Sequence, residues 1–395
     1  MVWWYHTTID WLCLKVCKCD QHFFPFFVPL VPNNGWCPLA LSTQGSTHHT
    51  MTSTIALEES RRHSPVPGFF CRERFEHINA EDVAPSVIFS CNILPSPKHH
   101  DNLQVPVLEF VCRDPSCGAL LPTEDAVVVE EDERVDPNFF DSGYTLAGRT
   151  GFKVWTGTRF MIETLLWPLP REKDFERLVY WQERIRKGLH ILELGAGVGV
   201  VGSCLAAEGG HVLLTDLPTL VENSVAPNLG RIQSTFASVL SSSSTSTTLE
   251  EPTATWLGPP GVSIGRGWAS TASLDWSESV ANQISTKQSE QVDLIVASDC
   301  VFLVEMLQLL LSTAAALFEI SASRRPSLIL SFQRRDAQNG DNSQSFTTVN
   351  RVVREVKARN WSIDCLAWRP VVVGRETSEV FLFEITPPWK EFVAR

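Results

Sequence analysis

Short apolar runs alternate with helix-period segments along the last two-thirds of the chain. The first run, residues 189–194, ends in a glycine-rich turn, and residues 200–208 follow with the composition of a helix. Further strands are predicted at 211–215, 292–297, 327–332, 361–368 and 379–385. Further helices are predicted at 217–228, with an interruption at Pro227, and at 302–319 and 346–360. This alternation predicts an α/β fold with a Rossmann-like, doubly wound, mostly parallel seven-stranded sheet, and the last two strands, which have no helix between them, predict an antiparallel C-terminal edge.

A polar stretch interrupts the alternation at about residues 229–272. It contains a run of consecutive hydroxyl residues, Ser241–Thr248, followed by Gly258-Pro-Pro-Gly261. Such a composition offers too little apolar surface to offset the entropy of ordering a chain. We therefore expect a flexible insertion here, with the third strand of the sheet within residues 261–274.

The N-terminal third lacks such a pattern. Residues 1–100 are rich in Pro, Cys, His and Trp without a sustained period, so a poorly ordered region is expected. Residues 101–147 are predicted to hold short strands at 103–111 and 126–129 and an acidic loop at 130–133, which leaves 148–395 as the main domain. The spacing of Cys13, Cys17, Cys19 and His22 does not match paired C-x2-C knuckles, which favours ordinary flanking sequence over a metal site.

Composition narrows the possible partners and the compartment. A net charge of −12 over 395 residues disfavours a protein whose affinity depends on neutralising phosphates, so nucleic acid is not the expected partner. The apolar stretch at 23–32 is short and broken by prolines, so we expect neither a secretory signal nor a membrane span. Of the 11 cysteines, only Cys204, Cys300 and Cys365 lie beyond residue 117, which is a poor disulfide scaffold. We expect a monomer in a reducing compartment, the cytoplasm or also the nucleus.

The most specific chemical signal is the turn after the first strand, Glu193-Leu-Gly-Ala-Gly-Val-Gly199, together with Asp216 at the end of the second strand. Glycines let the backbone approach a ligand closely, and the helix that begins there directs its positive end at the same point. An acid at the end of the second strand can accept both hydroxyls of a ribose. The pattern predicts a cofactor that contains adenosine.

Two cofactors compete for this site. Gly197, Gly199 and Gly202 satisfy the G-x-G-x-x-G pattern of dinucleotide sites, with Asp216 near the expected spacing. Glu193, however, would repel a pyrophosphate and suits the ammonium of a methionine moiety, which favours S-adenosylmethionine. A glycine turn that only packs helix on strand is the third interpretation.

Four segments in this order carry a resemblance to a known family: residues 151–157, residues 191–199, Leu274-Asp-Trp276, and residues 292–302. The chain resembles the seven-strand, class I S-adenosylmethionine-dependent methyltransferases over about residues 148–388. More narrowly, it is similar to methyltransferase family 16, which contains protein lysine methyltransferases.

The resemblance implies a role for each matched position. Trp155 would pack beside the cofactor, Asp216 would hold the ribose, Trp276 would flank the adenine, and Ser298 would contact the cofactor through its backbone. The cofactor-binding residues that we expect are Trp155, Glu193, Gly195, Ala196, Gly197, Asp216, Trp276 and Ser298.

The acceptor side falls on the D-x-x-Y/F motif of that family, here Asp299-Cys-Val-Phe302. Asp299 would orient the ammonium of the acceptor lysine, and the ring of Phe302 would line the channel around the lysine side chain. We expect both residues to be catalytic. The alternatives are a helix N-cap for Asp299 and an ordinary core position for Phe302. Because the turn lacks the N/D-P-P-Y/F prolines, nucleobase and amide acceptors are disfavoured.

The expected function is methyl transfer to an exposed lysine of a protein substrate. Two alternatives stay open: a methyltransferase of a small molecule or nucleic acid on the same fold, and a non-catalytic module that binds the cofactor.

Overall fold

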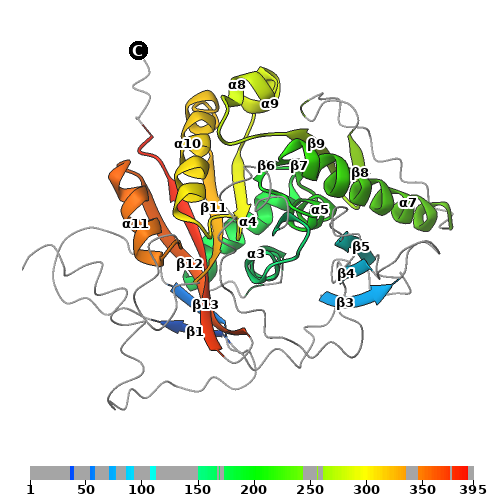
Figure 1. Cartoon of the computed structure of the whole chain (residues 1–395), viewed down its shortest axis with the longest axis horizontal. Coiled ribbons are helices and arrows are strands. Elements are labelled where there is room, and N and C mark those ends of the chain that lie inside the picture. The colour runs from blue at the N-terminus through cyan, green and yellow to red at the C-terminus, as the bar shows by residue number, and fades with distance from the viewer. Residues whose placement is uncertain are drawn as a thin grey trace, which may run out of the picture.

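The computed structural model of the chain contains a large mixed sheet and a smaller separate sheet (Figure 1). The large sheet has the strand order β1-β2-β12-β13-β11-β10-β6-β7-β9-β8, and the small one the order β3-β4-β5. The described residues are the five N-terminal strands and residues 150–166, 169, 173–242, 256, 261–334, 346–373 and 376–389.

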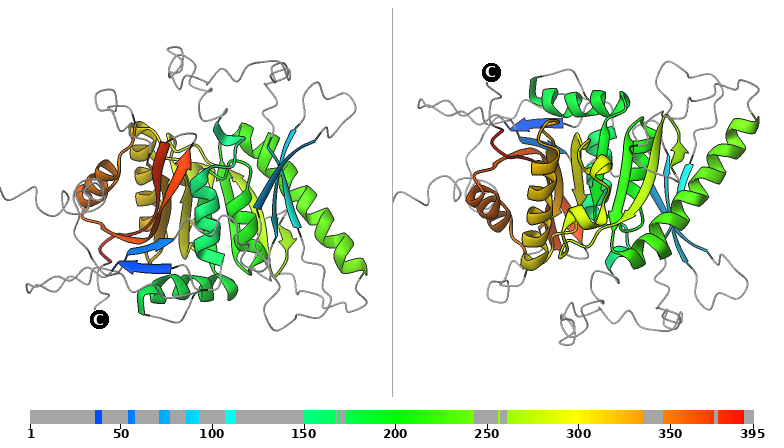
Figure 2. Two further views of the ribbon diagram at one scale, coloured as in Figure 1. Left: turned by 90° about the horizontal axis from the view of Figure 1, so that it is seen from below. Right: turned by 90° about the horizontal axis from the view of Figure 1, so that it is seen from above.

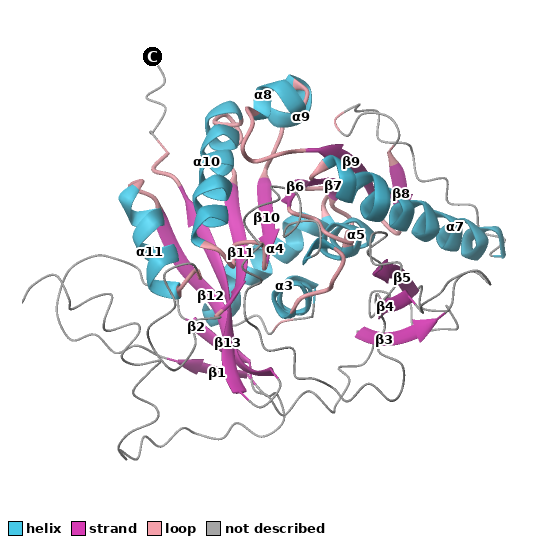
Figure 3. Ribbon diagram, viewed as in Figure 1, coloured by secondary structure: helices cyan, strands magenta, loops and turns pink. Residues whose placement is uncertain are grey.

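Five parallel strands form the centre of the large sheet (Figure 3). They are β6 (His190–Leu194), β7 (His211–Asp216), β9 (Gly267–Ser273), β10 (Leu294–Ser298) and β11 (Ser327–Gln333). β6 and β10 pair side by side, with Leu294 opposite Ile191, and this is the point where the strand order reverses. In open sheets of this kind, ligands bind beyond the carboxyl ends of the strands at such a switch point.

The edge beyond β11 is antiparallel, as the sequence predicts. β13 (Glu376–Thr386) pairs antiparallel with β11 and with β12 (Ser362–Val373). The two outer ends extend the sheet beyond the seven predicted strands. β8 (Val262–Ile264) is added beside β9, and β1 (Trp36–Leu39) and β2 (Thr54–Leu57) are added beside β12.

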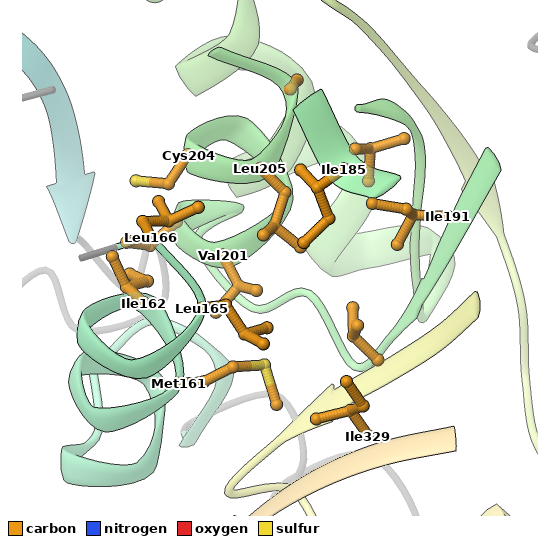
Figure 4. Close-up of a cluster of buried hydrophobic side chains, with 14 of the residues drawn as sticks. Met161, Ile162, Leu165, Leu166, Ile185, Ile191, Val201, Cys204, Leu205 and Ile329 are labelled. Carbon is orange, nitrogen blue, oxygen red and sulfur yellow. The ribbon is translucent and has the colours of Figure 1, made fainter. Parts of the chain in front are cut away.

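Helices cover both faces of the sheet (Figure 2). One face carries α3 (Thr156–Leu166), α4 (Glu176–Arg186, preceded by the 3-10 turn Lys173–Phe175) and α5 (Val200–Ala207). Their side chains pack in a buried hydrophobic cluster against the sheet (Figure 4). In this cluster Met161 of α3 and Val201 of α5 lie near Ile329 of β11. The other face carries α10 (Val304–Ile320), α11 (Val349–Ala358) and the short helices α8 (Val280–Gln283) and α9 (Thr286–Ser289).

The region after β7 differs from the sequence prediction. Instead of a helix that ends near Pro227, the chain forms α6 (Pro218–Leu220), a π-helical turn η4 (Val221–Val225) and then α7 (Ala226–Ser242). Pro227 lies just after this π-helical turn, inside a helical run that is unbroken from Pro218 to Ser242. A proline inside a helix removes one intrahelical hydrogen bond, and a π-helical turn is a common site of such an irregularity. The interruption that the sequence predicts at Pro227 is thus a local change of helix type rather than a break.

The expected flexible insertion is therefore partly structured. Most of α7 and the strands β8 and β9 lie within residues 229–272, and β9 is the third strand of the central sheet. Trp256 is only 1% exposed, stacks on His190 with ring centroids 4.6 Å apart, and donates its indole N–H to the Gln288 carbonyl. Trp256 is thus buried, although the sequence around it is polar on average.

The small sheet consists of β3 (Cys71–Glu76), β4 (Ser86–Asn92) and β5 (Val107–Cys112), in antiparallel pairing. Leu108 and Phe110 of β5 are fully buried in the same cluster as α3 and α5. The Asn228 side chain of α7 accepts the Val111 N–H at 2.9 Å and donates to the Val111 carbonyl at 3.2 Å. The predicted strand at 126–129, the acidic loop and the Cys/His group at 13–22 lie outside the described residues.

Candidate cofactor and acceptor site

The glycine turn lies at the carboxyl end of β6, at the switch point of the sheet. Gly195, Gly197 and Gly199 have φ values of +70°, +59° and +83°, a region that other residues rarely adopt. At Gly197 a side chain would also collide with the Gly151 carbonyl, which lies 2.8 Å from where its Cβ would be. Between these glycines, the Ala196 N–H donates to the Thr215 carbonyl of β7 at 3.0 Å. The predicted turn is thus held against two neighbouring segments.

Asp216 ends β7 and faces this turn. Its carboxylate accepts the Gly197 N–H at 2.7 Å and the Leu217 N–H at 2.8 Å. Burial raises the pKa of Asp216 to about 6, although both amide bonds act in the opposite direction. Each carboxylate oxygen has two lone pairs, so these two bonds leave acceptor capacity for a ribose diol.

Glu193 lies under the turn rather than beside it. Its side chain is 1% exposed, and Oε2 accepts the N–H of Gly202, the third residue of α5, at 2.9 Å. Burial raises the pKa of Glu193 to about 8, and the nearby Asp216 charge adds to the rise. The geometry does not present this carboxyl to the methionine ammonium that the sequence suggested, because the side chain points at α5.

The same contact bears on the dinucleotide interpretation. A pyrophosphate in such folds binds the free amides at the start of the helix. Here Glu193 occupies one of those amides, and a Cβ on Gly202 would lie 2.5 Å from Oε2. Gly202 is therefore a glycine because the glutamate packs against it, and the third glycine of the G-x-G-x-x-G pattern has a structural explanation.

Trp155 lies just before α3, in the segment that reaches the turn from the opposite side. Its indole N–H donates to the Thr150 carbonyl at 3.0 Å, and the Lys153 ammonium lies 4.7 Å from the centre of its ring. Gly151, in the same segment, approaches Gly197 as described above. The structure therefore brings the Trp155 segment and the glycine turn together.

Trp276, which follows β9, comes to the same edge of the sheet. The Leu274 N–H donates to the Asp216 carbonyl at 2.8 Å, and the Trp276 ring lies 3.3 Å from where a Cβ on Gly195 would be. Cys300 lies beside it, with its Cβ 3.1 Å from the same point. The sequence prediction missed Cys300 as a member of this site, although it stands inside the D-x-x-F motif.

The environment of Cys300 makes it a neutral contact rather than a nucleophile. Burial raises the pKa of the Cys300 thiol well above its usual value, and the charges of Asp216 and Asp299 raise it further. The Sγ atom lies 3.8 Å from the Leu194 carbonyl, to which the protonated thiol donates.

Ser298 and the D-x-x-F motif lie at and just beyond the carboxyl end of β10. Ser298 shares a 3.0 Å hydrogen bond with Thr158 of α3, between the two hydroxyl groups. Asp299 is 3% exposed and accepts the Gly157 N–H and the Gln333 N–H. Phe302 is 8% exposed and lies outside the two main hydrophobic clusters, and its carbonyl accepts the Thr347 N–H at 2.8 Å.

Asp299 is not the N-cap of the helix that follows it. α10 begins at Val304 and its N-cap residue is Leu303. Five residues, 299–303, separate Ser298 from Val304, the first residue of that helix, so Asp299 does not stand at the N-cap position. The two amides that its carboxylate accepts belong to Gly157 of α3 and Gln333 of β11.

These residues fit an adenosine cofactor with a methionine part. Two glycines in the left-handed region leave the backbone uncovered, Asp216 keeps acceptor capacity, and the Trp276 ring borders the turn. Within the described part of the chain, no group of three or more His, Cys, Asp or Glu side chains could hold a metal ion. No helix among those residues is long and apolar enough to cross a membrane.

Comparison with known proteins agrees with this geometry. Residues 144–240 and 266–351 match the family described as lysine methyltransferase, and these ranges include all four segments that carry the resemblance. The resemblance to methyltransferase family 16 is thereby confirmed.

Individual relatives match less of the chain. A stretch of 46 residues is 46% identical to EEF1A lysine methyltransferase 3 of Xenopus tropicalis, which covers 11% of this chain and 20% of that protein. The match thus spans about a fifth of that relative's length.

Among solved structures, magnesium protoporphyrin IX methyltransferase (ChlM) of Synechocystis with bound SAH is 13% identical, over 57% of this chain and 92% of that one, with a TM-score of 0.28. The glycopeptide N-methyltransferase MtfA complexed with S-adenosylmethionine is 14% identical, over 52% and 86% respectively, with a TM-score of 0.31.

Proposed function

We propose that this chain, whose residues 144–240 and 266–351 match the lysine methyltransferase family, transfers a methyl group from S-adenosylmethionine to a lysine side chain of a protein. The observation that carries the proposal is the meeting of the glycine turn, Asp216 and Trp276 at the switch point of a sheet that has the strand order of class I methyltransferases. The family match supports lysine as the acceptor.

The cofactor is S-adenosylmethionine, and the chain's residues would hold it in three places. Asp216 would accept the ribose hydroxyls, Trp276 would cover the adenine, and the backbone of Gly195 to Gly197 would border the methionine part. Trp155 would close the site from the α3 side. When bound, S-adenosylmethionine supplies an electrophilic methyl group on a sulfonium.

The acceptor would enter on the β10 side of the turn. Phe302 would offer an apolar aromatic wall to the methylene groups of a lysine. An acceptor amine must be neutral to react, and its reference pKa is about 10.4. A buried aromatic wall disfavours the charged form and so favours proton loss. With the reacting atoms held in line, positioning supplies much of the acceleration.

The test is transfer of label from S-adenosylmethionine by the purified full-length chain to the proteins of a cell extract, with mass spectrometry of the modified band. We expect methyl groups on lysine, and none with the Gly197→Arg variant, whose side chain would collide with Gly151. Label in nucleic acid or small molecules alone would refute a protein acceptor. If calorimetry detects no binding of S-adenosylmethionine to the purified chain, the assignment of this cofactor is refuted.

A further inference from the structure

Asp299 joins three elements of the fold at the acceptor side. Its Oδ2 accepts the Gly157 N–H of α3 at 2.9 Å, and its Oδ1 accepts the Gln333 N–H at the end of β11 at 3.0 Å. Its own N–H donates to the Ser331 carbonyl of β11 at 3.0 Å. Because Asp299 itself follows β10, one residue fixes α3, β10 and β11 to one another.

The backbone of Asp299 is held in an uncommon conformation to make these bonds. Its φ of +55° lies in the left-handed region, which Asp and Asn tolerate better than other residues with a side chain. This turn directs the carboxylate away from the following helix α10 and toward α3. Such strain persists only where the surrounding contacts determine it.

On the α3 side, the bond is a helix cap supplied from a distant part of the chain. Gly157 is the second residue of α3, so its N–H has no partner within the helix. The first turn of α3 contains no acidic residue of its own. The approach is so close that a Cβ on Gly157 would lie 2.9 Å from the Asp299 carboxyl carbon. A second hydrogen bond, between the hydroxyl groups of Thr158 and Ser298, joins the same helix end to the same strand end.

The segment 150–157 therefore spans the carboxyl edge of the sheet and is held at both ends. At one end, Gly151 packs on Gly197 of the glycine turn. At the other end, Gly157 is bound by Asp299. Trp155 lies between them, with its indole N–H bound to Thr150 of the same segment.

We propose that Asp299 is a positioning residue, which holds the segment 150–157 against the glycine turn and thereby sets the affinity for the cofactor. The proposal rests on the proposed function for the identity of the cofactor. It differs from a role in binding the acceptor lysine, because its first effect is on S-adenosylmethionine rather than on the acceptor.

The test is the Asp299→Asn variant, which keeps the size of the side chain but has only one acceptor oxygen for two N–H donors. We expect the Kd for S-adenosylmethionine to rise about tenfold, the effect of one lost hydrogen bond to a charged group. We also expect faster hydrogen exchange at the Gly157 amide, and a higher KM for the cofactor with an unchanged KM for the acceptor. A role in docking the lysine would leave cofactor affinity and Gly157 exchange as in the parent.

Asp293→Asn is the matched control at the opposite end of the same strand. Asp293 is 6% exposed and binds the His190 N–H and the Arg324 guanidinium. Its loss should lower thermal stability while cofactor affinity stays at the parent value. If both variants weaken cofactor binding equally at a temperature where both are folded, the effect is general destabilisation and the proposal is overturned.

Thr158→Val decides the question if Asp299→Asn does not fold, since it removes only the hydroxyl bond to Ser298. Unchanged cofactor affinity in this variant would overturn the proposal. The proposed function fails separately, if the parent itself does not bind S-adenosylmethionine. In that case the exchange rate of the Gly157 amide in Asp299→Asn still shows whether Asp299 holds α3.

Discussion

Replacing Glu193 with Gln should remove a pH dependence of stability. Burial raises the pKa of this carboxyl from 4.5 to about 8, so near neutral pH the folded protein holds a proton that the unfolded chain has already released. The contribution is therefore fully present below pH 4.5 and is lost as the pH rises toward 8. At about 1.4 kcal/mol per pH unit, the free energy of unfolding should fall by on the order of 1.5 kcal/mol between pH 6.5 and pH 8 through this group alone. Gln keeps the acceptor for the Gly202 N–H but does not titrate.

Urea unfolding of the parent and of Glu193→Gln across this window measures the difference. Burial raises the pKa of Asp216 only to about 6, so most of its titration lies below the window. Burial lowers the pKa values of His190 and His211 from their usual value of 6.5. These two groups therefore also change the free energy of unfolding mainly below the window of pH 6.5 to 8. Parallel curves for the two proteins would refute the reasoning. Cofactor affinity should change less than about twofold, and a large loss would show that the Glu193 charge faces the methionine ammonium after all.

Four other substitutions and one loop replacement test separate parts of the structure. Gly197→Arg should abolish S-adenosylmethionine binding in calorimetry and Asp216→Ala should weaken it, because the first collides with Gly151 and the second loses the ribose acceptor and the Gly197 contact. Trp256→Ala should lower the free energy of unfolding, measured with urea, by about 3–5 kcal/mol, as is usual for a buried tryptophan. Replacing residues 243–254 with a short Gly/Ser linker should shift the melting temperature by only a few degrees. Phe302→Ala should raise the KM for the acceptor in transfer assays with little change in cofactor affinity, and an unchanged KM would return Phe302 to a core role.

The sequence predicted the centre of the fold because its signals are local. The run that became β6 is apolar and ends in glycines, and all three glycines of the turn indeed adopt positive φ. Asp216 also lies where a strand-end acid was expected, and it contacts the turn directly. A strand, a turn and the next strand end can be recognised within about 30 residues of chain, without knowledge of distant contacts.

The elements that the sequence did not predict depend on distant contacts. α3 and α4 were missed, although α4 buries Leu178 and Trp181 and α3 fills the space beside β11. The insertion was expected to be flexible because its composition is polar on average. An average composition does not reveal that one residue, Trp256, is buried and stacks on His190. A deletion of the whole predicted insertion, residues 229–272, would remove most of α7, the buried Trp256, the strand β8 and nearly all of β9.

The carboxylates of the site show most clearly where sequence reasoning ends. Each was assigned to a ligand from its motif, and each accepts the N–H of a glycine in another element: Glu193 from Gly202, Asp216 from Gly197, and Asp299 from Gly157, at 2.9, 2.7 and 2.9 Å. Glycine permits this approach because it has no Cβ to keep the carboxylate away. The acids thus fix the backbone around the cofactor site before any ligand binds. Substitution by Ala would remove this architecture and any ligand contact together, so only amide variants, compared through cofactor affinity and stability in parallel, can separate the two roles.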